Sequence, residues 1–250
     1  MTRRRFYAPP TAFDSDRKGV TLANDEARHL REVLRLKAGA EVYVFDGEGK
    51  EFQCTIQESR RDSAYLKVIS EIDPARSESP LHLILAVALL KGEKFDLVVQ
   101  KATELGVSQI VPVITKLADI RLRDASDADK RVARWQRIAM EAAKQCGRPV
   151  VPSVDTPVSF ATFVNQTVPD THLRLLFSER DGGTLAEALP EAINAVTALV
   201  GSEGGWVDEE ISSARAAGWK IVTLGGRVMR AETAAISVTT LLQHLAGDLR

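Results

Sequence analysis

The chain has 250 residues, of which 44% are hydrophobic and 27% charged, a composition typical of a soluble globular protein, and its formal net charge is −1. Its longest apolar run, Leu81–Leu90, falls far short of the roughly 20 residues that a membrane span needs, so we expect no membrane partner. The basic segment Met1–Phe6 lacks an apolar stretch and is not expected to be a secretory signal. The two cysteines, Cys54 and Cys146, are far apart and the four histidines are scattered, so we expect no metal site and a reduced, cytoplasmic setting.

The N-terminal part of the chain shows strand patterning. Alternating or β-branched residues predict strands over Glu41–Asp46, Glu51–Glu58 and Ser63–Ser70. The sequence DGEG at 46–49 predicts a hairpin between the first two strands. A helix is expected near Asn24–Leu34, with Asn24 as its N-cap. Together these patterns predict a small β-barrel domain over residues 1–73.

A linker and a different pattern follow. The segment 73–80 (DPARSESP) holds two prolines, two serines and no apolar periodicity, which is typical of a linker. Over residues 80–250, apolar runs alternate with helical patterns, and this alternation predicts an α/β domain with a parallel sheet covered by helices on both faces. The expected strands are Leu81–Leu90, Gln109–Ile114, Leu173–Phe177, Ala195–Val200 and Trp219–Leu224, and the expected helices are Glu93–Leu105, Asp127–Cys146, Asp208–Ala217 and Glu232–Ala246.

Glycine-rich loops follow the last two predicted strands, GSEGGW at 201–206 and GGRVMRAETA at 225–234. Ligands bind an open parallel sheet beyond the carboxyl ends of its strands, and glycine lets a ligand approach the backbone closely. Neither loop has the glycine spacing of a dinucleotide fingerprint or a P-loop, and Glu203 would oppose a pyrophosphate. A neutral or cationic ligand such as S-adenosylmethionine suits the loops better. The alternative is two tight turns with structural glycines.

The pair GSEGGW and LGGRVMRAETAA resembles the glycine-rich loops of SPOUT methyltransferases, and within them those of the bacterial family that methylates N3 of a uridine in 16S ribosomal RNA. Other segments resemble that family in the same order: RRFY at 4–7, the stretch 29–35, KGEKFDLVVQKATELGV at 91–107 and RWQRIAMEAAKQCGRP at 134–149. The resemblance covers nearly the whole chain.

Three positions depart from the family pattern. Ser202 replaces the proline of the usual GPEGG loop, and Met229 replaces a leucine. Val207 stands where a Ser or Thr hydroxyl would cap the next helix, so Asp208 or Glu210 would have to compensate near the helix start. These changes affect the start of that helix more than the function.

The resemblance implies a C-terminal SPOUT domain with a deep trefoil knot, an N-terminal PUA-like RNA-binding domain, and a homodimer with the cofactor site near its interface. It also implies ribosomal RNA or the small ribosomal subunit as the partner. Cofactor contacts are expected from Phe177, Gly201, Ser202, Gly204, Leu224, Gly225, Val228, Met229, Arg230 and Ala234. Contacts to RNA are expected from Arg3, Arg4, Arg5, His29, Arg35 and Arg148, although such basic clusters are often plain solvated surface.

Methylation of uracil N3 requires loss of the N3 proton, which spreads negative charge onto O2 and O4. Arg230 is the first candidate to stabilise that charge, because a guanidinium is planar and always charged. Its alternative role is an ion pair with Glu203 or Glu232. The base is left open between Glu203, Glu232 and solvent.

Two other functions remain open at this stage. One is a SPOUT enzyme that acts on a different RNA or on a ribose 2′-hydroxyl, and the other is a non-catalytic ribosome-assembly factor that only binds RNA. A nucleotide-dependent oxidoreductase is disfavoured because neither loop has the dinucleotide pattern.

Overall fold

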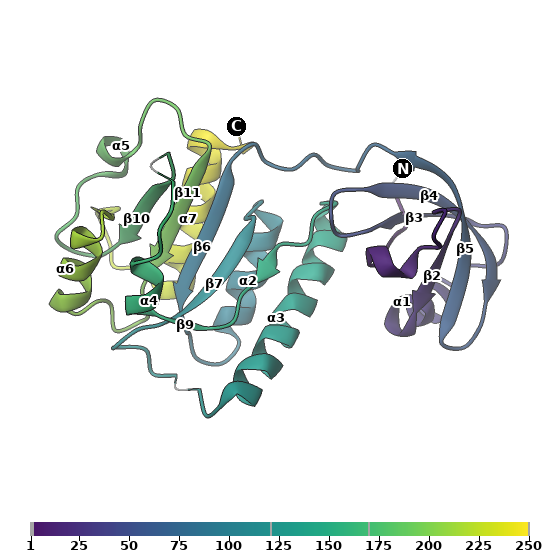
Figure 1. Cartoon of the computed structure of the whole chain (residues 1–250), viewed down its shortest axis with the longest axis horizontal. Helices are drawn as coiled ribbons and strands as arrows, with labels where there is room; N and C mark the ends of the chain where they lie inside the picture. Colours follow the sequence, from purple (N-terminus) through teal and green to yellow (C-terminus); the bar gives the residue numbers. More distant parts are fainter. Residues whose placement is uncertain (1–2, 121, 170, 250) are drawn as a thin grey trace. The chain divides into compact units, whose positions relative to one another are not determined.

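The computed structural model of the chain describes residues 3–120, 122–169 and 171–249 (Figure 1). Its internal contacts divide the chain into two compact units. The first consists of Met1–Glu78 and Met140–Val151, and the second of Ser79–Ala139 and Pro152–Arg250. Residues 140–151, which the sequence pattern grouped with the C-terminal domain, thus belong to the first unit.

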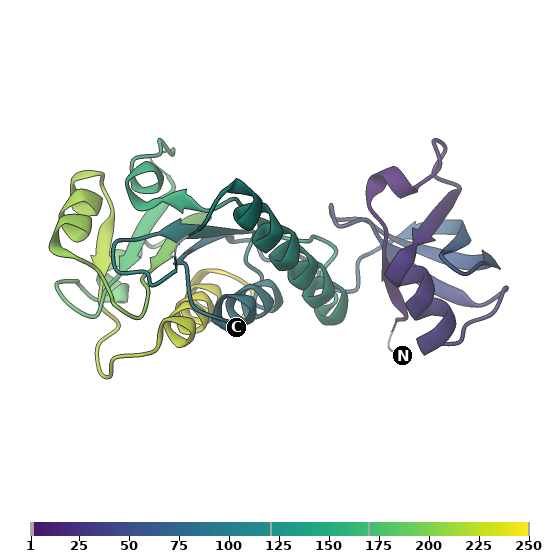
Figure 2. The same ribbon diagram turned by 90° about the horizontal axis from the view of Figure 1, so that it is seen from below.

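The first unit is built on a curled five-stranded sheet in the order β1-β3-β4-β5-β2 (Figure 2). β1 pairs with β3 in parallel, and the remaining pairs are antiparallel. Alternation sends Val42 and Val44 of β3 into a core that includes Phe6, Phe52 and Leu66. The strand bounds are Arg5–Tyr7 (β1), Gly19–Ala23 (β2), Glu41–Phe45 (β3), Glu51–Ser59 (β4) and Ser63–Ile72 (β5), and a short 3-10 turn, η1, covers Pro10–Ala12.

The predicted helix near Asn24–Leu34 is present but irregular. It consists of α1 (Asn24–Arg28) followed by a π-helical turn, η2 (His29–Val33). The prediction that Asn24 caps it is wrong, because the cap position is Ala23 and no side chain caps the helix. Asn24 instead has a φ of 49°, a left-handed conformation that asparagine tolerates, and its N–H donates to the carbonyl of Asp62 at 3.0 Å.

The second unit contains a parallel sheet of seven strands with the order β12-β10-β11-β6-β7-β8, and β9 also pairs with β7. The prediction of a parallel sheet is therefore confirmed. The strands are β6 (His82–Ala88), β7 (Gln109–Ile114), β8 (Ser153–Val154), β9 (Val158–Ser159), β10 (Leu173–Phe177), β11 (Ala195–Val200) and β12 (Lys220–Val222).

Helices cover both faces of this sheet (Figures 1 and 2). α2 (Lys94–Glu104) packs against α7 (Ala231–Ala246) on one face, and α4 (Phe160–Val164) packs against α6 (Asp208–Ala216) on the other. The unit also contains α5 (Leu185–Ala188) and the part of α3 (Ala125–Cys146) that precedes Met140. Both faces of the strands are buried, which explains why β11 is apolar at every position except Thr197. Within the described residues, no helix is long and apolar enough to cross a bilayer.

Candidate active site

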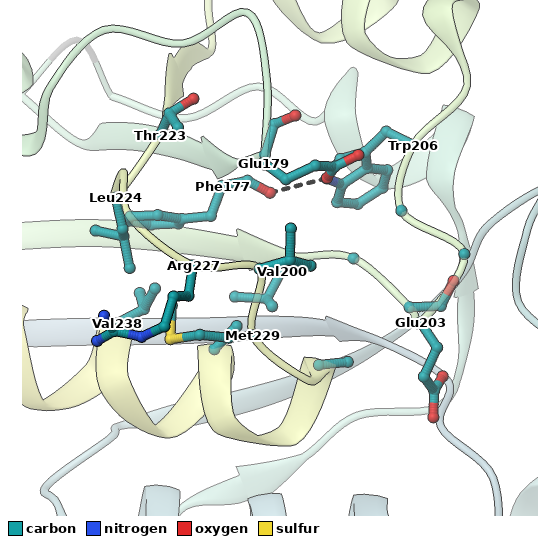
Figure 3. Close-up of a pocket in the computed structure, with 18 of the residues that line it drawn as sticks. Phe177, Glu179, Val200, Glu203, Trp206, Thr223, Leu224, Arg227, Met229 and Val238 are labelled. Carbon is teal, nitrogen blue, oxygen red and sulfur yellow. Dashed lines mark hydrogen bonds between the residues drawn. The ribbon is translucent and has the colours of Figure 1, made fainter.

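A cavity of about 320 Å³ lies at the carboxyl ends of three strands of the second unit (Figure 3). The register places Phe177, the last residue of β10, beside Val200 of β11 and Val222 of β12, so the loops that follow β11 and β12 leave the sheet together. These loops, at 201–207 and 223–230, provide most of the cavity wall. The two loops are over twenty residues apart in the sequence. They enclose one cavity because the parallel strands that precede them end at the same edge of the sheet.

The structure brings together all the residues predicted to bind the cofactor except Arg230. Phe177, Gly201, Ser202, Gly204, Leu224, Gly225, Val228, Met229 and Ala234 line the cavity, and so does Glu203. Arg230 and Glu232 do not line it, but Ala231 between them does. The two residues therefore lie at the margin of the cavity, where helix α7 begins.

Trp206 holds the first loop in place. Its indole N–H donates to the carbonyl of Phe177 at 2.8 Å, and the side chain is buried. Gly201 runs so close to this indole that an added Cβ would lie 3.0 Å from the ring. On the other side of the loop, a Cβ on Gly204 would lie 2.8 Å from Cβ of Leu117. The glycines of this loop thus allow its backbone to pack tightly against Trp206 and Leu117. The loop also lines the cavity.

The second loop is shaped by backbone conformation. Gly225 and Gly226 have φ values of 75° and 72°, which residues with a side chain adopt at a cost. A Cβ at either position would meet nothing within 4 Å, so the space beside this turn is open. The loop therefore presents bare backbone N–H and C=O groups to a ligand.

The lining fits a polar organic ligand. The Ser202 hydroxyl is buried and has no hydrogen-bond partner among the residues that the structure describes, and such a group is rare unless a ligand or water satisfies it. The volume lies at the lower end of the range for small-molecule pockets, about 300–1,000 Å³. Glu179 and Glu203 also line the cavity, and Glu179 suits a ligand that carries positive charge. Glu179 was not predicted, although its place two residues after β10 is a signal that could have identified it.

The start of α6 shows how the chain accommodates Val207. The helix begins at Asp208, and Val207 at the cap position makes no side-chain cap. Glu210 is the residue that compensates, since its buried carboxylate accepts the N–H of Val207 at 3.3 Å and that of Lys116 at 2.9 Å. The missing hydroxyl therefore does not displace the helix start.

A charged cluster of Lys94, Glu203, Glu232 and Arg230 lies at the cavity margin. Lys94 Nζ is 2.5 Å from Glu203 Oε1 and 4.0 Å from Glu232 Oε2. Arg230 is exposed and forms no ion pair with the described residues, so the carboxylates pair with Lys94 instead. Sequence reasoning gave Lys94 no role, although it lies in the lysine-containing segment 91–107 that carries part of the family resemblance.

The ion pair changes the acidity of both partners. The hydrogen bond to Glu203 raises the pKa of the Lys94 ammonium. Partial burial acts to raise the pKa of the Glu203 carboxyl, but the hydrogen bonds from Lys94 and from a backbone N–H outweigh it and hold the pKa below its ordinary value. Glu203 is therefore a carboxylate at neutral pH.

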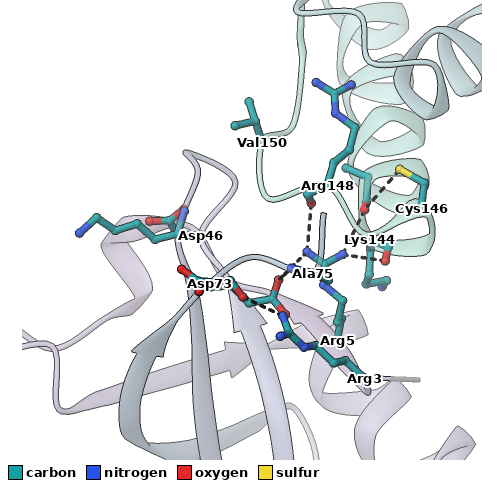
Figure 4. A network of polar contacts seen from close by, with 12 residues as sticks. Arg3, Arg5, Asp46, Asp73, Ala75, Lys144, Cys146, Arg148 and Val150 are labelled. Carbon is teal, nitrogen blue, oxygen red and sulfur yellow. Dashed lines mark hydrogen bonds and ion pairs between the residues drawn. The ribbon is translucent and has the colours of Figure 1, made fainter. Parts of the chain in front are cut away.

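Two of the arginines predicted to contact RNA are buried in the first unit, which corrects that prediction (Figure 4). Arg5 donates to the carbonyls of Ala143, Lys144 and Arg148 and pairs with Glu51 at 3.2 Å. The Arg5 and Arg148 side chains are only 6% and 7% exposed. Arg148 in turn pairs with Glu78 at 2.6 Å. Both guanidinium groups therefore bind other residues of the first unit.

The other residues of that predicted set lie nearer the surface. Arg3 is half-buried and pairs with the same Glu51 at 3.2 Å. Arg4 and Arg35 are exposed, and the partly buried ring of His29 packs edge-on against Phe6 with 6.0 Å between ring centroids. Arg4 and Arg35 are thus the members of the set whose charges face solvent.

Comparisons with known proteins agree with this geometry. Residues 77–243 match the family model of an RNA methyltransferase domain, and residues 22–69 match that of an RNA methyltransferase PUA domain. A relative from Synechocystis, named ribosomal RNA small subunit methyltransferase E, is 35% identical over 94% of this chain and 75% of its own length. Two solved structures are also similar over 100% of both chains. One is the ribosomal RNA small subunit methyltransferase E of Neisseria gonorrhoeae bound to S-adenosyl methionine, with 33% identity and a TM-score of 0.89. The other is a methyltransferase of Legionella pneumophila in complex with SAM, with 32% identity and a TM-score of 0.90. The chain belongs to the RNA methyltransferase family that includes ribosomal RNA small subunit methyltransferase E.

Proposed function

We propose that this chain is an S-adenosyl-L-methionine-dependent methyltransferase that methylates N3 of a uridine in 16S ribosomal RNA. The observation that carries the proposal is the cavity between the two glycine-rich loops, with the unpartnered Ser202 hydroxyl in its wall. Relatives of the same fold were solved with this cofactor. The cofactor supplies a methyl group on a positively charged sulfur, which suits a cavity that Glu179 lines.

The nine predicted residues that line the cavity are the proposed cofactor contacts. Backbone groups of the loop at 223–230 bind the ligand's polar edges, since the turn at Gly225 presents them without a side chain. The buried walls Phe177 and Val200 supply apolar surface, and the Ser202 hydroxyl supplies a hydrogen bond. A mainly apolar cavity with a few placed polar groups is the usual form of a small-molecule site.

Arg230 is the proposed stabiliser of the deprotonated uracil. It is exposed, it precedes a residue that lines the cavity, and it forms no ion pair in the described part of the chain, so its guanidinium is available to O2 or O4. Loss of such a donor typically lowers a rate by about 10²–10³-fold. Glu203 and Glu232 are the candidate bases of the same site.

Residues 1–73 form the proposed RNA-binding domain, and residues 80–250 the methyltransferase domain, of which residues 140–151 belong to the first compact unit. The match of residues 22–69 to a PUA domain and the exposure of Arg4 and Arg35 support this assignment. Ribosomal RNA, free or within the small ribosomal subunit, is the proposed partner. The logarithm of RNA affinity should fall against the logarithm of salt concentration with a slope near −0.7 per phosphate contacted, and a flat response would contradict the phosphate contacts.

A homodimer belongs to the same proposal. α2 and α7 pack side by side and leave apolar side chains exposed, with Leu97 at 40%, Leu241 at 36% and Leu245 at 52%. A second copy would cover them. The deep trefoil knot and a cytoplasmic location are likewise proposed from family membership. Sedimentation of the wild type against Leu245→Lys tests the dimer, which the substitution should weaken.

The deciding experiment compares the nucleosides of ribosomal RNA from cells with and without this protein. Mass spectrometry should show 3-methyluridine in small-subunit RNA only when the protein is present. Appearance of 2′-O-methyluridine instead would favour action on the ribose, and no change in any nucleoside would favour a factor that only binds RNA. Calorimetry with the Gly204→Val variant, whose side chain would collide with Leu117, should show weaker cofactor binding.

A further inference from the structure

The charged cluster at the cavity margin distinguishes the two candidate bases, and the argument rests on the proposed function. Glu203 comes from the loop after β11, Glu232 from the first turn of α7, and Lys94 from the first residue of α2. Three segments that are far apart in the sequence thus place two carboxylates around one ammonium group.

Glu203 is the carboxylate that is already engaged. Lys94 donates to its Oε1 at 2.5 Å, and in Figure 3 its carboxylate points away from the labelled cavity residues. The same contact holds the pKa of the carboxyl below its ordinary value, which makes it a weaker proton acceptor. Glu203 therefore serves to fix Lys94 to the cofactor loop.

Glu232 is the carboxylate that can still accept a hydrogen bond. Its side chain is 13% exposed, and its Oε2 atom is buried without a hydrogen-bond partner among the described residues. Lys94 Nζ lies 4.0 Å from this atom, close enough for electrostatic attraction but too far for a hydrogen bond. A buried acceptor without a donor is destabilising, so it favours a ligand that brings an N–H group. The N3–H of uracil is such a donor.

Glu232 lies beside the cavity and not in its wall. Ala231 and Ala234 of helix α7 line the cavity, and Glu232 does not, because successive residues of a helix point about 100° apart. Lys94 from α2 lies 4.0 Å from Glu232 Oε2, Arg230 acts electrostatically on Lys94, and the charged groups that act on Glu203 are Lys94 and Asp119. A uracil placed beside Glu232 thus meets one proton acceptor and has the Lys94 ammonium nearby.

We propose that Glu232 accepts the N3 proton of the target uridine, and that Lys94, anchored by Glu203, is the residue that positions the cofactor loop against helix α7. The proton moves to a carboxylate oxygen of Glu232, and its former bonding pair stays on N3. That pair forms the N3–CH₃ bond while the bond between methyl carbon and sulfur breaks and leaves its electrons on sulfur. Arg230 and Lys94 face the negative charge on O2 and O4 during this step.

The test compares Glu232→Gln and Glu203→Gln at a series of pH values, with RNA methylation in a single turnover and cofactor affinity by calorimetry as readouts. We expect Glu232→Gln to lower the rate by about 100-fold or more and to remove the fall in rate on the acid side, while it keeps cofactor affinity. Glu203→Gln should retain the acid-side fall. The proposal is overturned if Glu203→Gln loses it and Glu232→Gln keeps it.

The positioning role has its own comparison. Lys94→Met should slow methylation by about tenfold or more and weaken cofactor binding, and Lys94→Arg should restore much of both, because small misplacements of reacting groups are costly. Lys116→Met is the matched control, since Lys116 and its partner Glu209 are exposed and 3.5 Å apart on the surface. If Lys94→Met behaves as this control does, the positioning role is wrong. A wild type that neither binds the cofactor nor yields 3-methyluridine would instead refute the proposed function.

Discussion

Replacement of Glu51 by glutamine tests whether Arg5 stabilises the first unit rather than binds RNA. The Glu51 carboxylate is fully buried and accepts hydrogen bonds from Arg3, Arg5 and the N–H of Ala75. The substitution leaves Arg5, whose side chain is only 6% exposed, without a negative partner among the described residues. Loss of one member of a buried pair typically costs about 3–5 kcal/mol. We expect a loss near the lower end, about 3 kcal/mol, because three backbone carbonyls still accept from Arg5.

Unfolding in urea, monitored separately by tyrosine and by tryptophan fluorescence, measures the loss of stability in the first unit alone. An m value of about 1–3 kcal/mol/M converts the expected loss into a midpoint shift of about 1–3 M. The tyrosine signal should shift by this amount, and amide exchange should accelerate along β4. The tyrosines, Tyr7, Tyr43 and Tyr65, all lie in the first unit, and the tryptophans, Trp135, Trp206 and Trp219, all lie in the second.

Glu71→Gln is the control for this experiment. Glu71 pairs with Lys50 at 3.1 Å on the surface, with both side chains about half exposed, so its loss should cost about 0–1 kcal/mol. If Glu51→Gln destabilises the first unit no more than this control does, the buried network is not what holds Arg5. The assignment of RNA contacts to Arg5 would then have to be restored.

Three further predictions concern the cavity, the thiol and an internal ion pair. Gly225→Val should weaken cofactor affinity by about tenfold or more, since it strains a turn with a φ of 75°, whereas Gly39→Val, at a φ of 86° in the first unit, should leave that affinity unchanged in calorimetry. Burial raises the pKa of the Cys54 thiol to about 12, so at pH 8 only about one molecule in 10⁴ carries the reactive thiolate. Mass spectrometry should find Cys54 alkylated by iodoacetamide only after unfolding, and rapid labelling of the folded chain would contradict its burial. Burial acts to lower the pKa of Lys144, but the hydrogen bonds to Glu26 and Glu141 and the charges of these two carboxylates together outweigh it, and the net pKa is raised. The stability that this pair contributes is therefore fully present below about pH 10.4 and is lost as the pH rises through the raised pKa, so the difference in unfolding free energy between wild type and Lys144→Met should shrink in strong alkali.

The local sequence pattern was sufficient to predict the long helices and strands and the two glycine-rich loops of the cavity. The strands 173–177 and 195–200 were predicted with the bounds that the structure has, because a strand buried on both faces reads as a largely apolar run. The glycines of the two loops were visible because each follows such a strand. The three-residue strand Arg5–Tyr7 was missed, since it is a strand only through its pairing with residues 43–45.

The roles of charged side chains were decided by the tertiary structure alone. A run of arginines looks the same in the sequence whether it faces solvent or not, and Arg5 meets its partners across 46 to 143 positions of the chain. Lys94 and Glu203 are likewise 109 positions apart. The sequence by itself determined the parallel sheet, the place of the cavity and the family, because apolar periodicity and glycine act over a few neighbouring residues. Only the folded chain decided which charges are paired, since an ion pair depends on distance in space and on burial, and neither is a property of neighbouring residues.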